Sequence, residues 1–185
     1  KKQIRVNPNA RDIKKIDTYI TVSHEGITGH MYQYAYTYAH NKSHYMKAIA
    51  NNKGFTEGYA VYCQYYCLKY LNLDQNVLNA YKYNEILSYI AIMQADIGIH
   101  YDGWTLDRFK SEMKNYGFSL DDNGAKKQYE QLWANPGAFA PYYLGYLQIN
   151  QLLKETKNRL KDQFDHKMFI ASLIESGAAP FSVIK

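Results

Sequence analysis

The recurrence of apolar residues at helical spacing is the feature that most limits what this chain can fold into. Near the C-terminus, Leu152 and Leu153 follow Ile149 by three and four residues and Leu160 follows Leu153 by seven, which places their side chains on one helix face. Similar spacing recurs along most of the chain, and no alternating strand pattern competes with it. We therefore expect a mostly α-helical domain, with at most one or two short strands near the N-terminus.

Turn and capping residues divide this pattern into segments. The expected helices cover about residues 13–40 (interrupted at 28–29), 56–71, 77–100, 105–117, 119–135, 145–160 and 165–177. Thr56, Thr105 and Asp165 are the expected N-caps, because their side-chain oxygens can accept hydrogen bonds from first-turn amides. A length of 185 residues predicts one domain, residues 1–185.

Composition excludes several functional classes. The 22 Lys and Arg against 17 Asp and Glu give a net charge of +5 without a basic run, so no nucleic-acid partner is expected. The most apolar run, residues 86–99, contains polar residues and is shorter than the roughly 20 residues of a membrane span. Cys63 and Cys67 are spaced for one helix face, where they read as core residues rather than as a disulfide.

The segment His24-Glu25-Gly26-Ile27-Thr28-Gly29-His30 carries the clearest chemistry. Imidazole is a good zinc ligand, and a neighbouring carboxylate can take a proton from zinc-bound water. The i, i+6 spacing would point the two histidines about 120° apart on an ideal helix. They converge only if the helix is distorted at Gly26 or Thr28-Gly29; otherwise one caps a helix and the other packs in the core.

Glu57 is the best candidate for a third ligand. It lies 27 residues after His30, at the start of a predicted helix. A carboxylate in that position is also what the helix dipole favours without any metal. Both readings of Glu57 stay open from the residues alone.

Five ordered blocks resemble the bacterial DUF885 family over about residues 20–184. The first is His24–His30 with Gln33, which resembles the family's H-E-x-x-P-G-H-x-x-Q. The others are 57–62 (E-G-W-A-x-Y in the family), 96–100 with 103–105 (D-x-G-x-H…G-W-T), 136–145 (P-G-Q-A…Y-x-x-G) and 177–180 (G-x-x-P). The chain departs from the pattern at Thr28 for Pro, Met31 for a frequent His, and Gln131 where an Arg is common.

The resemblance implies a zincin-like helical metallopeptidase catalytic domain, distantly similar to the thermostable carboxypeptidase group. Members are usually several hundred residues long, so the chain resembles their C-terminal, metal-binding portion. By this resemblance His24, His30 and Glu57 bind Zn²⁺, and Glu25 is the general base on zinc-bound water. Family members are often exported or anchored as lipoproteins, which gives the expected location.

The remaining roles concern the tetrahedral intermediate and the substrate. We expect His100 to stabilise the oxyanion, with Asp96 orienting its ring; the alternative is a pair that only caps the helix end. Tyr142 and Tyr146 are alternative donors. Tyr146 and Gln33 are further expected to contact the substrate. His40 and His44 share an i, i+4 spacing but read as surface residues.

The sequence thus favours a zinc-dependent metallopeptidase acting on short peptides, with a peptide substrate and no nucleic acid or membrane span. One alternative is a non-catalytic binding or structural module in which the metal is only a folding staple. A further alternative is an aromatic-lined module that binds glycans or peptides without any metal. A fourth protein ligand would favour the staple, because structural zinc sites are usually closed by four protein ligands.

Overall fold

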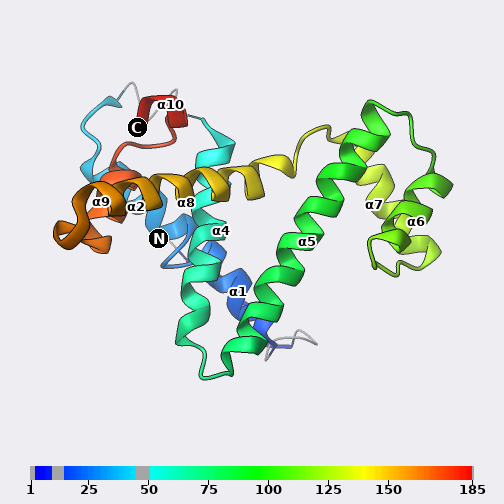
Figure 1. Ribbon diagram of the computed structural model, residues 1–185, viewed down its shortest axis with the longest axis horizontal. Helices are drawn as coiled ribbons and strands as arrows, with labels where there is room; N and C mark the ends of the chain where they lie inside the picture. Colours follow the sequence, from blue (N-terminus) through cyan, green and yellow to red (C-terminus); the bar gives the residue numbers. More distant parts are fainter. Residues whose placement is uncertain (1–2, 10–14, 45–50, 185) are drawn as a thin grey trace.

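The computed structural model describes residues 3–9, 15–44 and 51–184, and its regular structure there is helical throughout (Figure 1). The helices are α1 (Ile16–Glu25), α2 (His30–His40), α4 (Lys53–Cys67), α5 (Gln75–His100), α6 (Leu106–Asn115), α7 (Asp122–Ala134), α8 (Ala140–Leu160), α9 (His166–Glu175) and α10 (Phe181–Ile184), with 3₁₀ turns η1 (Leu68–Tyr70) and η2 (Lys161–Gln163). The mostly α-helical prediction is confirmed.

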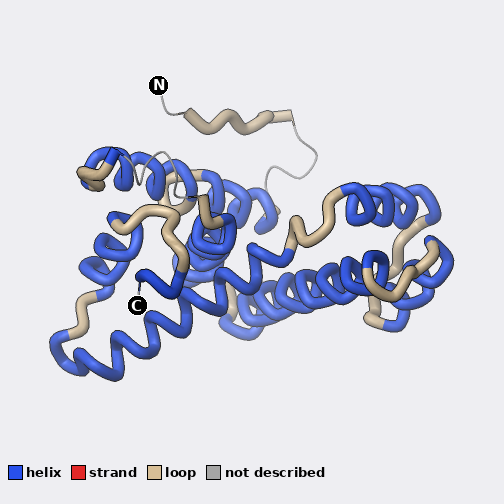
Figure 2. The backbone as a smooth tube through the Cα atoms, turned by 90° about the horizontal axis from the view of Figure 1, so that it is seen from above, coloured by secondary structure: helices blue, strands red, loops and turns tan. Residues whose placement is uncertain are grey.

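The expectation of short N-terminal strands is wrong for the described residues, and Figure 2 shows none. Residues 3–7 have no regular structure and lie beside α1, where Ile4 and Val6 line a shallow hollow with Val22. A strand needs the free backbone groups of a partner, and α1 already uses its own within the helix. The predicted helix start at Ile13 lies outside the described residues; α1 begins at Ile16.

The caps follow the prediction at two positions and differ at a third. Thr105 accepts a hydrogen bond from the amide of Arg108, and Asp165 accepts one from the amide of Met168. Thr56 is not a cap, because α4 begins at Lys53 with Asn52 as its N-cap. Asn52 also donates to the carbonyl of Ala179, which joins the start of α4 to the C-terminal loop.

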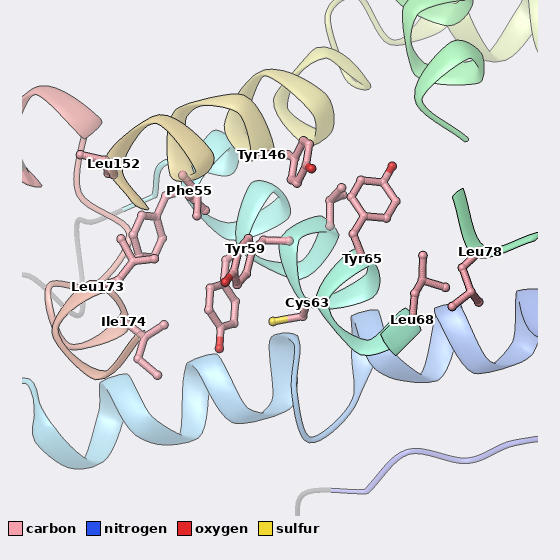
Figure 3. Close-up of a cluster of buried hydrophobic side chains, with 13 residues drawn as sticks. Phe55, Tyr59, Cys63, Tyr65, Leu68, Leu78, Tyr146, Leu152, Leu173 and Ile174 are labelled. Atoms are coloured by element: carbon pink, nitrogen blue, oxygen red, sulfur yellow. The ribbon is translucent and has the colours of Figure 1, made fainter. Parts of the chain in front are cut away.

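The main hydrophobic core lies where α4 crosses α8 and rests on α1 (Figure 3). Glycines permit this close crossing. A Cβ added to Gly58 would lie 2.2 Å from the carbonyl carbon of Gly145, and one added to Gly145 would lie 1.8 Å from the carbonyl oxygen of Gly54. Phe55 and Tyr59 of α4 are almost fully buried in this core. The crossing fixes the first turns of α4 beside the start of α8.

A second hydrophobic cluster lies at the far end of α5, where α6 and α7 pack against it (Figure 1). Gly98 accommodates the buried ring of Trp104, because a Cβ there would lie 2.3 Å from the ring atoms. Phe109 and Leu132 complete the cluster from α6 and α7. The long helix α5 contributes to both clusters and so links α6 and α7 to the α4–α8 core.

Candidate metal centre

A break between α1 and α2 brings His24 and His30 together. α1 ends at Glu25 and α2 begins at His30, so two helices replace the single distorted helix that the sequence predicts. At Gly29 a Cβ would lie 1.7 Å from the carbonyl oxygen of His24, so the break has no room for a side chain there. The two imidazole rings end 4.7 Å apart between centroids and nearly perpendicular, at 88°.

Thr28 holds this break against the core. Its hydroxyl donates to the carbonyl of Ser23 at 2.9 Å, and the thiol of Cys63 on α4 donates to the Thr28 carbonyl at 2.8 Å. Cys63 is buried, as expected for a core cysteine. The connection between α1 and α2 is therefore fixed to the helix that carries Glu57.

Glu57 on the first turns of α4 faces both imidazoles. Its Oε2 lies 3.5 Å from Nε2 of His24 and 3.3 Å from Nε2 of His30. These separations exceed the usual hydrogen-bond range of about 2.7–3.2 Å. They match the edge of about 3.4 Å that a tetrahedron has when its centre lies about 2.1 Å from each ligand, the bond length of zinc to nitrogen and oxygen. The two contacts of Glu57 are thus compatible with a zinc ion shared between Glu57 and each imidazole.

His24, His30 and Glu57, called the triad below, are close enough for their charges to interact. Burial disfavours the charge of Glu57, but its interactions with the nearby rings of His24 and His30 outweigh burial and lower the pKa of Glu57 to about 2. Burial also opposes a charge on His30, yet Glu57 outweighs it and raises the pKa of His30. The site therefore presents an ionised carboxylate, the form that binds metal.

Glutamine side chains lie behind both imidazoles. The Oε1 of Gln64 on α4 lies 2.5 Å from Nδ1 of His24, and the Oε1 of Gln33 lies 3.4 Å from Nδ1 of His30. Each ring thereby has Nδ1 engaged and Nε2 directed at Glu57. Gln33 is 3% exposed, so its position suits orientation of His30 better than the contact with substrate expected from the sequence.

Glu25 lies at the open side of the triad. Its side chain is exposed, and one ligand atom each from His24, Glu25 and His30 all lie within 4.8 Å of one another. Glu57 is the more enclosed of the two carboxylates and contacts both rings. Glu25 is thus placed either to act on a molecule bound at the triad or to become a further ligand.

Two tyrosines flank the imidazoles. Tyr142 of α8 stacks on His24 with centroids 6.1 Å apart, and Tyr34 of α2 stacks on His30 at 6.0 Å. Burial, the charge of Glu57 and hydrogen bonding with it raise the pKa of Tyr142, so its hydroxyl keeps its proton. Of the tyrosines considered as donors, Tyr142 is brought to the site.

Tyr146, one turn later, is not at the site. It is 8% exposed, and its ring packs edge-on against Tyr65 with centroids 4.9 Å apart in the α4–α8 core (Figure 3). The expected contact of Tyr146 with a substrate does not fit this position. Residues four apart share one helix face, but one turn further along α8 that face is covered by Tyr65 of α4.

His100 and Asp96 form the expected pair, and their contacts are with α7 and with the turn before α8. Nε2 of His100 donates to the carbonyl of Leu132 at 3.0 Å and lies 3.4 Å from Asp96, whose other oxygen accepts from the amide of Gly137 at 2.7 Å. Among the described residues no hydrogen bond, ion pair or ring contact joins His100 to the triad. The pair instead holds the end of α5 to α7 and to the turn before α8.

Two hollows adjoin the triad. One of about 300 Å³ is lined by Lys53, Glu57, Gln131, Asn135, Ala138, Phe139 and Tyr142. The other, of about 410 Å³, is lined by residues of α1, α4 and α5 that include His24, Glu25 and Glu85, and Tyr142 borders both. Both sides of the triad are thus open to a small extended molecule.

The other histidine pair, His40 and His44, is exposed, as the sequence predicts.

Sequence reasoning missed Gln64, Glu85 and Tyr34. Gln64 follows Glu57 by seven residues, two helical turns on the same face, and this spacing was a usable signal. Tyr34 follows His30 by four residues and could have been found in the same way. Glu85 contacts Gln64 from another helix, and no local spacing indicates that contact.

The comparisons with known proteins concern fold and family. A presumed lipoprotein from Colwellia psychrerythraea has a similar solved structure, with TM-score 0.78 and 24% identity over 97% of this chain and 31% of that chain. A presumed lipoprotein of unknown function from Shewanella oneidensis gives TM-score 0.78 and 27% identity over 94% of this chain and 32% of that chain. The chain therefore spans about a third of the length of these proteins. No curated protein gives a significant match.

Within the described part of the chain, no helix combines the length and apolar character that crossing a bilayer requires. The family model described as bacterial protein of unknown function, DUF885, matches residues 4–185 and thus nearly the whole sequence. The match includes the break between α1 and α2 and the start of α4, which together form the triad. The chain belongs to the DUF885 family.

Proposed function

We propose that this chain is the zinc-binding portion of a hydrolase that cleaves peptides. The observation that carries the proposal is that Oε2 of Glu57 lies 3.5 Å from Nε2 of His24 and 3.3 Å from Nε2 of His30, so that one carboxylate oxygen faces both imidazoles. The glutamines behind both rings support it, because metal-binding histidines usually have their other nitrogen engaged. The zincin-like character of the helical fold is part of this proposal.

The chemistry divides among the residues that surround the triad. Zinc bound there would polarise the substrate carbonyl and make water a better nucleophile at neutral pH. Glu25, exposed beside both histidines, takes the proton from the attacking water and passes it to the departing amine. Tyr142 donates its hydroxyl hydrogen to the carbonyl oxygen as negative charge develops there. His100, in its contact with Leu132, has no part in these steps.

The two hollows suggest how a substrate lies. An extended peptide placed across the triad would have one end among the amides and ring of Gln131, Asn135 and Phe139, and the other beside α1 and α5. Volumes of about 300 and 410 Å³ suit a few residues on each side and favour short peptides.

A structural role for the metal is the second candidate, and the position of Glu25 favours it. A ligand atom of Glu25 lies within 4.8 Å of those of His24 and His30, so a small rotation would make it a fourth protein ligand. Four protein ligands are typical of structural zinc, whereas a catalytic ion keeps one position open. The two candidates therefore differ in what Glu25 does.

The Glu25→Gln variant separates the candidates. We expect it to retain zinc and to lose turnover of a short-peptide library by at least about 100-fold, the usual contribution of a general base. Glu130→Gln, an exposed change on α7, is the matched control and should keep both properties. Loss of zinc from Glu25→Gln would show that the Glu25 carboxylate is a ligand and would support a structural role for the metal. Retained turnover would remove Glu25 from the mechanism.

The likeness to two presumed lipoproteins supports a location outside the cytoplasm, either exported or anchored to a membrane surface. Fractionation of cells that express the native gene, followed by immunodetection, tests this. Recovery with the periplasm or the membranes is expected, and recovery with the cytoplasm alone would contradict it.

A further inference from the structure

Two polar side chains from different helices, the buried Gln64 and the half-buried Glu85, form a chain behind His24. The Oε1 of Gln64 on α4 lies 2.5 Å from Nδ1 of His24, and the Nε2 of Gln64 donates to Oε1 of Glu85 on α5 at 2.9 Å. Gln64 is 4% exposed. The contacts thus connect a candidate zinc ligand, through one amide, to a carboxylate on a helix that carries no ligand.

The direction of these hydrogen bonds follows from what each group can do. An ionised carboxylate only accepts, so Glu85 requires the NH₂ end of Gln64. That leaves the amide oxygen of Gln64 facing His24, and because an amide oxygen also only accepts, Nδ1 of His24 must carry the hydrogen. In the neutral ring, the form that binds metal, Nε2 then keeps its lone pair on the side that faces Glu57. The reversed amide would place its oxygen against the carboxylate of Glu85.

Packing alone does not explain Glu85. Its Oε2 is buried and has no hydrogen-bond partner within the usual distance and angle limits among the described residues. The hydroxyl of Tyr65 is also buried without a partner by the same limits. Burial raises the pKa of Glu85, and the neighbouring side chains of Gln64 and Tyr65 and the ring of His24 offset only part of that effect. A buried carboxylate with an unpartnered oxygen lowers stability, and such groups often persist where they serve a function.

We propose that Gln64 and Glu85 are positioning residues for zinc: Glu85 fixes the amide of Gln64, and Gln64 fixes His24 with its hydrogen on Nδ1 and its Nε2 lone pair toward the metal. This inference rests on the proposed zinc site. The support behind His30 differs, since Gln33 belongs to the same helix and its Oε1 lies 3.4 Å from Nδ1. His24 is therefore the ligand whose orientation depends on contacts between helices.

Zinc affinity, measured by competition with a chromogenic chelator, is the first test. We expect Gln64→Ala to weaken binding by about 10- to 100-fold, the usual effect of removing the group that orients a ligand. Glu85→Gln, nearly identical in shape, should cause a smaller loss because its own amide can turn. Ser88→Ala is the matched control. Ser88 lies on α5 and lines, with Glu85, the hollow of about 410 Å³, and its hydroxyl donates to the carbonyl of Asn84 in its own helix. Circular dichroism verifies that each variant folds.

The tautomer of His24 is the second readout and needs no metal. Nitrogen-15 NMR of the zinc-free protein, recorded at a pH where the ring nitrogen shifts report a neutral imidazole, should show His24 with hydrogen on Nδ1. In Glu85→Gln the amide of Gln64 can reverse and donate to Nδ1, so the hydrogen should shift toward Nε2. A change in packing alone would not move it.

The outcomes separate this inference from the proposed function. Zinc binding by wild type, with unchanged affinity in both variants and an unchanged tautomer, would overturn the role of Gln64 and Glu85 while the zinc site stands. Absence of zinc binding in wild type would overturn the proposed function together with any role of the pair in metal binding. Weaker binding in Gln64→Ala together with the shifted tautomer in Glu85→Gln supports the inference.

Discussion

At the scale of single residues, the candidate site depends on which atoms are already engaged. His24 and His30 each have Nδ1 occupied by a glutamine oxygen, which leaves Nε2 for Glu57 and a metal. The sequence predicted His24, His30 and Glu57 together because motif spacing identifies residue types. It did not show which ring nitrogen is free, because that depends on Gln64, a neighbour 40 positions away from His24.

Glu85→Gln should also change how stability depends on pH. Because the pKa of Glu85 is raised in the folded protein above its ordinary value of 4.5, its favourable contribution to stability is present below the unfolded pKa and is lost as pH rises through the folded pKa. Its neighbours Gln64, Tyr65, His24 and Asp17 remain in the variant. The metal-free variant should therefore match wild type near pH 4 and exceed it near pH 8 by about 1–3 kcal/mol, the usual cost of an unpaired buried polar group.

Thermal unfolding of both zinc-free proteins across this pH range measures the difference. Ser88→Ala again serves as the control and should follow wild type at every pH. A gap between Glu85→Gln and wild type that stays constant from pH 4 to 8, or a variant that is less stable at pH 8, would contradict the assignment of a costly buried carboxylate.

At the scale of elements, the break between α1 and α2 is the structural device that makes the site. Gly29→Ala would place a methyl group 1.7 Å from the carbonyl oxygen of His24, so the two helices must move apart. We expect a loss of about 1–3 kcal/mol of stability, as in other overpacked positions, together with weaker zinc binding. Ile27→Ala in the same turn should change neither, because Ile27 is 75% exposed. Chelator competition and urea unfolding measure both quantities, and tight zinc binding in Gly29→Ala would contradict this role.

Elements were predictable where their signals are local. Thr105 and Asp165 cap helices through contacts with the next three residues, and Thr28-Gly29 marks the break that the structure contains. The start of α4 was missed because Gly54 suggests a turn, whereas it lies in the helix to allow the approach of Gly145. That approach is a contact between distant segments, and local spacing contains no information on it. The contact of His100 with the carbonyl of Leu132 on α7 was unpredictable for the same reason.

At the scale of the whole molecule, α5 runs from one hydrophobic cluster to the other. The triad lies beside the cluster around α4 and α8. Gly98→Ala would place a methyl group 2.3 Å from the ring of Trp104 and disturb the other cluster. We expect a loss of about 1–3 kcal/mol in stability and altered tryptophan fluorescence, with zinc stoichiometry unchanged. Ile97→Ala, at a residue 60% exposed, is the control. Loss of zinc from a folded Gly98→Ala protein would show that the clusters are not independent.

The central claim is that His24, His30 and Glu57 bind one zinc ion, and zinc content tests it most directly. Elemental analysis of protein purified without chelator should give about one zinc per chain in wild type and in His40→Ala, whose ring is exposed and stacks on Tyr36. His30→Ala should contain little or none, because removing one of three ligands opens the site. Wild-type protein without zinc even after zinc is supplied, or His30→Ala with undiminished zinc, would contradict the account.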